Sequence, residues 1–201
     1  MEPSKGGKRW RREVRKDLIN ARLAAGRPQR DRWNAVIETR LRELLAEPEG
    51  RVFGLCWPFK GEFDAREVAG DLVKQGGRAA LPVVVRPREP LEFWRWKPGD
   101  PIERGAYQIP IPRERQVVQP DVLLVPLVGF DAGCYRLGYG SGYFDRTIAA
   151  MGRKPLAIGL GYELSRLDTI FPRSHDIPMD YIVTEEHLLR RPVRPRSVPG
   201  Q

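Results

Sequence analysis

Residues 123–146 read LLVPLVGFDAGCYRLGYGSGYFDR and join an apolar run to a glycine-rich loop and then to a helical segment. The apolar run, Asp121 to Val125, predicts a buried strand that ends at Pro126. The loop extends from Gly129 to Gly142, and a helix is expected from about Tyr143 to Met151. In an open α/β sheet such a loop lies at the carboxyl end of a strand, where these folds bind their ligands.

A strand–helix–strand unit is predicted upstream of this stretch. The apolar runs Val52 to Trp57 and Ala79 to Val85 predict two strands, the second of them rich in β-branched residues. Between them, Asp64 to Gln75 has helical spacing, with Asp64 as a candidate cap and Gly76-Gly77 at its end. Strands joined through a helix are expected to be parallel, with a right-handed crossover.

The N-terminal part predicts a pair of basic helices. From Lys8 to Leu23 apolar residues recur sparsely among arginines, which gives a narrow helical stripe with one strongly basic side. The next helix has Pro28 near its start and ends at Pro48 and Gly50.

The remaining strands complete the predicted sheet. Leu91 to Trp96 alternates apolar and charged residues, which is typical of an exposed antiparallel strand, and Lys97 to Gln119 is predicted to be a proline-rich irregular connection. Short apolar runs at Ala157 to Leu160 and Tyr181 to Val183 predict two more strands. The sequence thus predicts a single-domain α/β fold: an open, mostly parallel sheet flanked by helices, with a basic N-terminal helical pair. We expect the domain to span residues 1–190 and a mobile basic tail to span residues 191–201.

Composition narrows the class of protein. The two cysteines, Cys56 and Cys134, supply neither a disulfide framework nor the spacing of metal ligands. No apolar stretch approaches the roughly 18 to 20 residues that a membrane span needs, and the polar, basic N-terminus has no signal-peptide core, so we expect a cytoplasmic protein. The formal charge of +9 would attract nucleic acid, acidic lipid or nucleotide phosphates without choosing among them, and most of it is expected on a solvated surface.

Three alternating glycines, Gly138, Gly140 and Gly142, determine the chemistry of the loop. Glycine lets backbone N–H groups converge on a ligand, and the helix N-terminus behind them adds partial positive charge, which together favour an anion. Arg136 can hold phosphate oxygens in a bidentate fork, and Asp145 offers the hard oxygen that magnesium prefers. The alternative is a tight glycine turn in which Arg136 and Asp145 form an ordinary ion pair. The loop matches neither a Walker loop nor a dinucleotide fingerprint, so its spacing indicates only a phosphate site.

The ordered run from Leu123 to Pro126, Gly129 to Asp131 and Arg136 to Arg146 resembles the signature of 5-formyltetrahydrofolate cyclo-ligases, also called methenyltetrahydrofolate synthetases. Further family features occur in the family's order, so the likeness spans roughly residues 8 to 186. These features are the basic helix Lys8 to Arg22, the acidic Glu62, the His175-Asp176 pair and the segment Ile182 to Glu185.

The resemblance implies a ligase of folate and one-carbon metabolism. Family members use ATP to close 5-formyltetrahydrofolate into 5,10-methenyltetrahydrofolate, and they release ADP and phosphate. In the family's scheme the formyl oxygen is first phosphorylated, N10 then attacks the activated carbon, and phosphate departs. The implied cofactors are ATP and Mg²⁺, and the implied partners are a reduced folate and a nucleotide. We expect a monomer that takes no nucleic acid and does not enter a membrane.

The resemblance also implies roles for individual residues. The implied nucleotide-binding positions are Lys8, Arg9, Arg12, Arg136, Leu137, Gly138, Tyr139, Gly140, Ser141, Gly142, Tyr143 and Phe144. The implied catalytic positions are Arg136, Tyr143 and Asp145, the implied magnesium ligands are Asp145 and Asp176, and the implied folate-binding positions are Trp57, Glu62 and Tyr107. Structural alternatives remain open. They are a solvated helix face for the N-terminal basic residues, packing for the aromatic ones, a surface carboxylate for Glu62 and a capping turn for Asp176.

Four substitutions and one shifted glycine, at Gly133-Cys134-Tyr135, depart from the family's pattern. Ser141 stands where many relatives have glycine or lysine, Phe144 replaces a second tyrosine, and Tyr162 and Ser165 replace a phenylalanine and a glutamine. An ATP-binding paralogue that acts on a different small acceptor is therefore the alternative function. A basic RNA-binding module is a weaker alternative, because the aromatic residues are dispersed and no nucleic-acid motif occurs.

Overall fold

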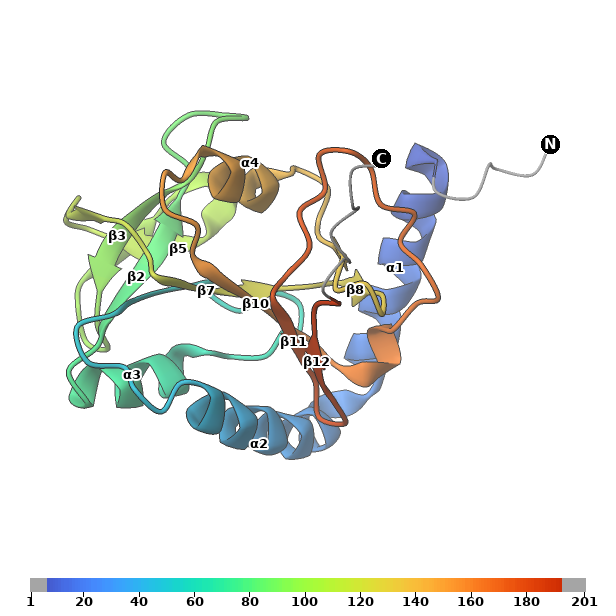
Figure 1. Ribbon diagram of the computed structural model, residues 1–201, viewed down its shortest axis with the longest axis horizontal. Coiled ribbons are helices and arrows are strands. Elements are labelled where there is room, and N and C mark those ends of the chain that lie inside the picture. The colour runs from blue at the N-terminus through green and yellow to red at the C-terminus, as the bar shows by residue number, and fades with distance from the viewer. Residues whose placement is uncertain (1–6, 193–201) are drawn as a thin grey trace, which may run out of the picture.

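An eight-stranded sheet in the order β12-β11-β10-β7-β1-β2-β3-β6 forms the centre of the protein in the computed structural model, which describes residues 7–192 (Figure 1). The parallel strands are β1 (Val52–Leu55), β2 (Arg78–Val83), β7 (Val122–Pro126), β10 (Leu156–Leu160) and β11 (Tyr181–Val183). The antiparallel strands are β3 (Glu92–Trp96), β6 (Val117–Val118) and β12 (Leu188–Arg190). The predicted α/β fold with a mostly parallel sheet is therefore confirmed.

Helices cover both faces of this sheet. α2 (Gly26–Leu44) and α3 (Arg66–Lys74) lie along one face, and α4 (Tyr143–Ala150) lies on the other (Figure 1). α1 (Lys8–Ala24) stands across the end of the sheet, where its side chains reach the segments that follow β1 and β7. All the predicted helices are present, and α1 begins at the expected residue. Of the described helices, none combines the length and the apolar character that crossing a membrane requires.

Alternation along the central strands explains why the sheet is buried on both faces. In β7, Val122 and Leu124 pack in the cluster under α2 and α3, whereas Leu123 and Val125 pack in the cluster under α4. Because every residue of such a strand points into one core or the other, the strand is a continuous apolar run in the sequence. This is why β1 and β7 could be predicted from the sequence alone.

Gly54, in the middle of β1, tests how tightly this core is packed. A Cβ atom built there would lie 2.6 Å from Phe93 Cε1 and 2.8 Å from Leu123 Cδ2. Both side chains are buried, so neither can move away from the added atom without disturbing the core. We expect Gly54→Ala to lower the free energy of unfolding by about 1–3 kcal/mol, measured by urea denaturation. Gly152→Ala is the matched control, because nothing lies within 4 Å of the added atom. Equal stability of Gly54→Ala and the control would contradict the prediction.

Several short elements were not predicted. The connection from Lys97 to Gln119 was expected to be irregular, but it contains β6 and a small hairpin. The hairpin and its turn consist of β4 (Ile102–Arg104), the 3₁₀ helix η1 (Ala106–Gln108) and β5 (Pro110–Pro112). The glycine-rich loop likewise contains a hairpin of β8 (Gly129–Phe130) and β9 (Arg136–Leu137), and β12 was not foreseen. Strands of two or three residues leave no readable alternation in the sequence.

Two details of the prediction need correction. The strand predicted at Leu91 to Trp96 is antiparallel, but it is not exposed as expected, because β2 and β6 flank it and Phe93 and Trp96 are buried. Asp64 is not the N-cap of α3. That position is Ala65, although Asp64 Oδ1 does accept a hydrogen bond from the Arg66 N–H at 3.1 Å. The predicted tail at 191–201 lies, from residue 193 onward, outside the described residues.

Candidate active site

The glycine loop, which we define as Gly138 to Gly142, connects β9 to α4 beyond the carboxyl end of β7. Gly140 has φ of 103° and Gly142 has φ of 64°, a left-handed conformation that disfavours other residues. Gly142 precedes the first turn of α4, so the loop leads directly into a helix N-terminus. The expected arrangement for an anion-binding loop is therefore present in the backbone.

Three arginines of α1 face the loops at this end of the sheet. Arg11 and Arg22 are buried and Arg15 is half-buried, and their spacing places them on one side of the helix. Arg15 Nε donates to the Gly138 carbonyl at 2.6 Å, and its guanidinium lies 3.3 Å from the position of a Cβ atom on Gly140. Burial, together with the nearby charge of Arg11, lowers the pKa of Arg15. α1 thus supports the glycine loop through its arginines.

The N-terminal residues implied by the resemblance lie elsewhere on α1. Lys8, Arg9 and Arg12 are exposed, and Arg9 pairs with Glu13 at 2.9 Å. Arg11, Arg15 and Arg22, which turn inward, are not among the residues that the resemblance implies. The one available signal was the spacing of arginines at positions 11, 15 and 22, which a helix brings to a single face.

Arg136 and Asp145 form a largely buried ion pair at the start of α4. Arg136 Nη1 donates to Asp145 Oδ1 at 2.9 Å and to the Ile177 carbonyl at 3.3 Å, and the Ile177 N–H donates to the same Asp145 oxygen at 3.0 Å. The side chains are 6% and 16% exposed. The ion pair between Arg136 and Asp145, one of the two predicted alternatives, is therefore present. Both of its side chains also form hydrogen bonds to the main chain of Ile177, the residue after Asp176.

Asp176 has a second arginine partner. Its Oδ2 accepts from Arg11 Nη2 at 2.7 Å and from the Arg173 N–H at 2.8 Å. Burial disfavours the charged form, but the hydrogen bonds from Arg11 and the Arg173 N–H outweigh it, so the pKa of Asp176 is lowered. Because the next residue, Ile177, contacts both Arg136 and Asp145, the two candidate magnesium ligands lie in one neighbourhood.

Glu62 is buried and belongs to a chain of hydrogen bonds. Its Oε1 accepts from the Tyr139 hydroxyl at 2.8 Å, and its Oε2 accepts from the Phe59 N–H at 2.9 Å. Tyr139 in turn accepts from Arg22 Nη2 at 2.9 Å. Burial raises the pKa of Glu62, against the lowering effects of Tyr139, Arg22 and the Phe59 N–H. The surface-carboxylate alternative is therefore wrong for Glu62, and a residue of the glycine loop contacts it directly.

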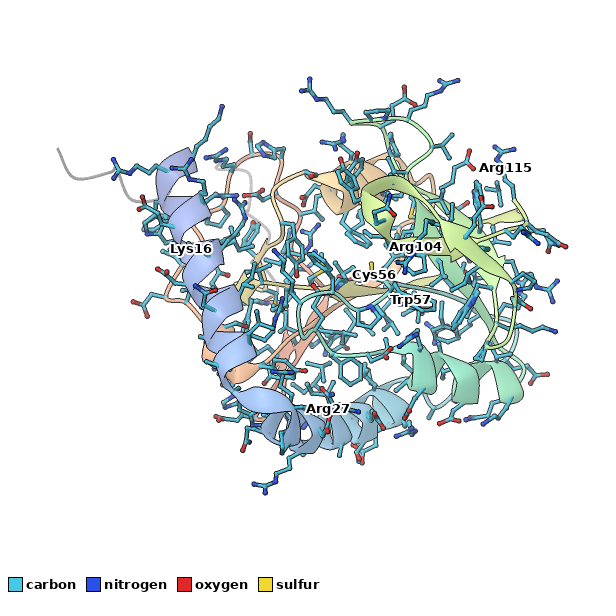
Figure 2. The ribbon with its side chains drawn as sticks, turned by 180° about the vertical axis from the view of Figure 1, so that it is seen from behind. Lys16, Arg27, Cys56, Trp57, Arg104 and Arg115 are labelled. Atoms are coloured by element: carbon cyan, nitrogen blue, oxygen red, sulfur yellow. The ribbon has the colours of Figure 1, made fainter. Side chains whose placement is uncertain are left out.

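The predicted aromatic positions have two different surroundings. Trp57 is half-buried, with the Arg66 guanidinium 4.2 Å from its ring centre and the Trp96 ring at 6.1 Å. Figure 2 shows it in the middle of the molecule, below Arg104 and to the right of α1. Tyr107 is 68% exposed, and its hydroxyl lies 3.3 Å from that of Tyr143. The structure thus brings Tyr107 to the first residue of α4, whereas Trp57 contributes to packing.

Two of the four substitutions relative to the family pattern face the interior. The Tyr162 hydroxyl donates to Asn34 Oδ1 at 2.7 Å, and its ring packs against Trp33 at 5.1 Å. Ser165 is buried and its hydroxyl donates to the Tyr162 carbonyl at 2.6 Å. Tyr162 and Ser165 therefore bond to the core and to each other. Ser141 is exposed in the glycine loop, and Phe144 lies beside the Arg136 guanidinium, 6.0 Å from its ring centre.

Comparisons with known proteins point to one family. The family model for the 5-formyltetrahydrofolate cyclo-ligase family matches residues 7–185. A 5-formyltetrahydrofolate cyclo-ligase of Haemophilus influenzae is 26% identical over 84% of this chain and 94% of its own length. One from Mycolicibacterium smegmatis is 32% identical over 67% of this chain and 74% of its own.

Solved structures give the same result. A 5,10-methenyltetrahydrofolate synthetase of Aquifex aeolicus has a TM-score of 0.78 at 29% identity, covering 94% of this chain and 96% of its own. A synthetase of the same name from Mycoplasma pneumoniae has a TM-score of 0.73 at 25% identity, covering 88% of this chain and 99% of its own. The family match over residues 7–185 spans the glycine loop, Glu62 and the segment around Asp176.

Proposed function

Because the chain belongs to the 5-formyltetrahydrofolate cyclo-ligase family, we propose that it converts 5-formyltetrahydrofolate to 5,10-methenyltetrahydrofolate, with ATP consumed and ADP and phosphate released. The observation that carries this proposal is the hydrogen bond from Tyr139 to Glu62. It joins the loop suited to a nucleotide and the carboxylate suited to a folate within one site.

The reaction needs positioning and charge neutralisation more than a protein nucleophile. The formyl oxygen is a poor leaving group until it is phosphorylated, and phosphoryl transfer is accelerated mainly by alignment and by stabilising the charge on the phosphate oxygens. The main-chain N–H groups of the glycine loop and the first turn of α4 would bind the phosphates, with Arg15 beside them. Arg136 would set the position of α4 through its pair with Asp145.

The residues present fit a magnesium ion. Among the described residues, both hydrogen bonds to Asp145 end on Oδ1, so its Oδ2 is available as a hard oxygen ligand. Asp176 is held ionised by Arg11 in the adjoining segment. A magnesium ion bound there would supply positive charge to the nucleotide phosphates. Arg136 and Arg11 would keep the two carboxylates charged and oriented for it.

The folate side is assigned to Glu62 and its aromatic neighbours. An ionised carboxylate pairs well with the amino and N–H donors of a pterin ring, and an aromatic face can stack on that ring. Phe59, which was not predicted, lies 5.7 Å from the Tyr139 ring and is 48% exposed, so it offers such a face beside Glu62. Tyr107 and Tyr143 offer a second pair of rings.

A product assay tests the proposal. Purified protein given 5-formyltetrahydrofolate, ATP and Mg²⁺ should develop the near-ultraviolet absorbance of methenyltetrahydrofolate, and excess EDTA should suppress it because the metal neutralises phosphate charge. An Arg136→Met, Asp145→Leu variant purified in parallel controls for contaminating activity. ATP binding without product would favour the paralogue with another acceptor. RNA binding that weakens steeply with salt, without ATP binding, would favour the nucleic-acid module. A cytoplasmic monomer stays a prediction.

A further inference from the structure

Arg22 joins three loops that come from distant parts of the chain. Nε donates to the Lys60 carbonyl at 3.0 Å, Nη1 to the Leu127 carbonyl at 3.2 Å and Nη2 to the Tyr139 hydroxyl at 2.9 Å. These acceptors belong to the segment after β1, the segment after β7 and the glycine loop. The side chain is only 5% exposed, so its position is fixed by these bonds and not by solvent.

Only the planar fork of arginine satisfies this arrangement. Its donors point in fixed directions within one plane, whereas an ammonium group offers three donors around a single point. The three acceptors are served by three different nitrogens of Arg22, which a lysine could not reproduce. The site therefore depends on an arginine at this position.

The Tyr139 hydroxyl connects Arg22 to Glu62. It accepts from Arg22 and donates its single proton to Glu62 Oε1. Because the hydroxyl proton has one place to go once Arg22 occupies a lone pair, the bond to the carboxylate is directional. The second carboxylate oxygen is held by the Phe59 N–H, so both oxygens of Glu62 are oriented while each retains a lone pair for a ligand.

On the basis of the proposed function, we propose that Arg22 is a positioning residue that orients Glu62 through the Tyr139 hydroxyl and keeps it charged for the folate. Arg22 does not touch the substrate in this role. Three groups face Glu62 from the elements packed against it: Arg22 from α1, Tyr139 from the glycine loop and Cys56 from the end of β1. Burial raises the pKa of the Cys56 thiol, so it stays neutral and Arg22 supplies the positive charge.

Two variants test this role. Arg22→Lys removes the planar guanidinium group that serves the three acceptors. Tyr139→Phe removes the hydroxyl group that connects Arg22 to Glu62, with little change in the shape of the side chain. For Arg22→Lys we expect the KM for 5-formyltetrahydrofolate to rise about 10- to 100-fold at neutral pH, and the KM for ATP to change less than about threefold. In both variants the acid limb of the kcat/KM profile for folate should move to higher pH, because Glu62 loses groups that favour its ionised form.

A titration that needs no turnover completes the test. The pKa of Glu62, followed by ¹³C NMR of its carboxyl carbon in the free protein, should be higher in Arg22→Lys and Tyr139→Phe than in the parent. Arg40→Met is the matched control, because Arg40 also donates to two main-chain carbonyls, those of Thr184 and Glu186, outside the site. It should change neither the titration nor the KM values.

The outcomes separate the two proposals. An unchanged Glu62 titration in both variants, or an equal change in Arg40→Met, would overturn the positioning role. If the parent protein forms no methenyltetrahydrofolate but the titration shifts as expected, the positioning role stands and the proposed substrate is wrong. Circular dichroism of each variant confirms that the fold is intact before either result is read.

Discussion

Replacing Arg136 with methionine is expected to abolish turnover and to lower the free energy of unfolding by about 3–5 kcal/mol, because it leaves Asp145 as an unpaired, largely buried charge. Asp145→Leu should have a similar cost, since Arg136 would then keep its charge without a partner. The measurements are urea denaturation and the rate of methenyltetrahydrofolate formation.

The double variant Arg136→Met, Asp145→Leu separates stability from chemistry. With both charges removed, it should be less destabilised than the sum of the two single changes, because neither partner remains unpaired. The free energy of unfolding should recover only in part, since the Ile177 N–H and carbonyl also lose their partners. Activity should not return at all. A double variant that turns over substrate, or a single variant with full activity, would remove this pair from the catalytic site.

Glu62→Gln is expected to lower kcat/KM for 5-formyltetrahydrofolate by about 10²-fold without loss of stability. The catalytic loss follows because an amide offers one accepting oxygen where the carboxylate offers two charged ones. The Gln Oε1 can still accept from the Phe59 N–H, but the amide nitrogen then faces the Tyr139 hydroxyl, whose proton loses its acceptor. Removing a buried charge offsets this lost hydrogen bond. Product formation measures the first effect and thermal unfolding measures the second.

The stability effect has a defined pH dependence. Burial raises the pKa of Glu62 above its ordinary value of 4.5. A carboxyl group with a raised pKa stabilises the folded state below its unfolded pKa, and this contribution is lost as pH rises through the folded pKa. At neutral pH, Glu62→Gln should therefore be at least as stable as the parent, and any advantage should vanish below pH 4.5. The exposed Glu49→Gln is the control. A clear loss of stability in Glu62→Gln at neutral pH would contradict this account.

The sequence predicted the parallel centre of the fold because burial on both faces leaves an unmistakable pattern. β1 and β7 are continuous apolar runs, and the helix between β1 and β2 ends just before Gly76-Gly77, as the sequence predicts. β12 and the β8–β9 hairpin were missed because their strands are only two or three residues long and leave no readable alternation. Leu188 to Arg190, for example, becomes a strand only because β11 lies beside it.

The sequence likewise predicted only part of the candidate site. The glycine loop, Arg136 and Asp145 are close in sequence, so their proximity could be foreseen, and Glu62 was placed by the resemblance. The face of α1 that turns inward could not be foreseen, because Lys8, Arg12 and Arg15 are all basic and the apolar stripe is weak. Which basic residue of α1 is buried depends on where the loops after β1 and β7 present their carbonyl groups, and these carbonyls accept from Arg22.

The way α1 docks has a consequence for sequence divergence. Arg11, Arg15 and Arg22 are held by the main-chain oxygens of Phe171, Gly138, Lys60 and Leu127. A carbonyl oxygen is present whatever side chain the residue carries, so the hydrogen bonds to residues 60, 127 and 171 do not depend on their side chains, although Leu127 and Phe171 also pack through theirs. A helix anchored in this manner tolerates drift in the loops that receive it, provided that their backbone path and its own three guanidinium groups persist.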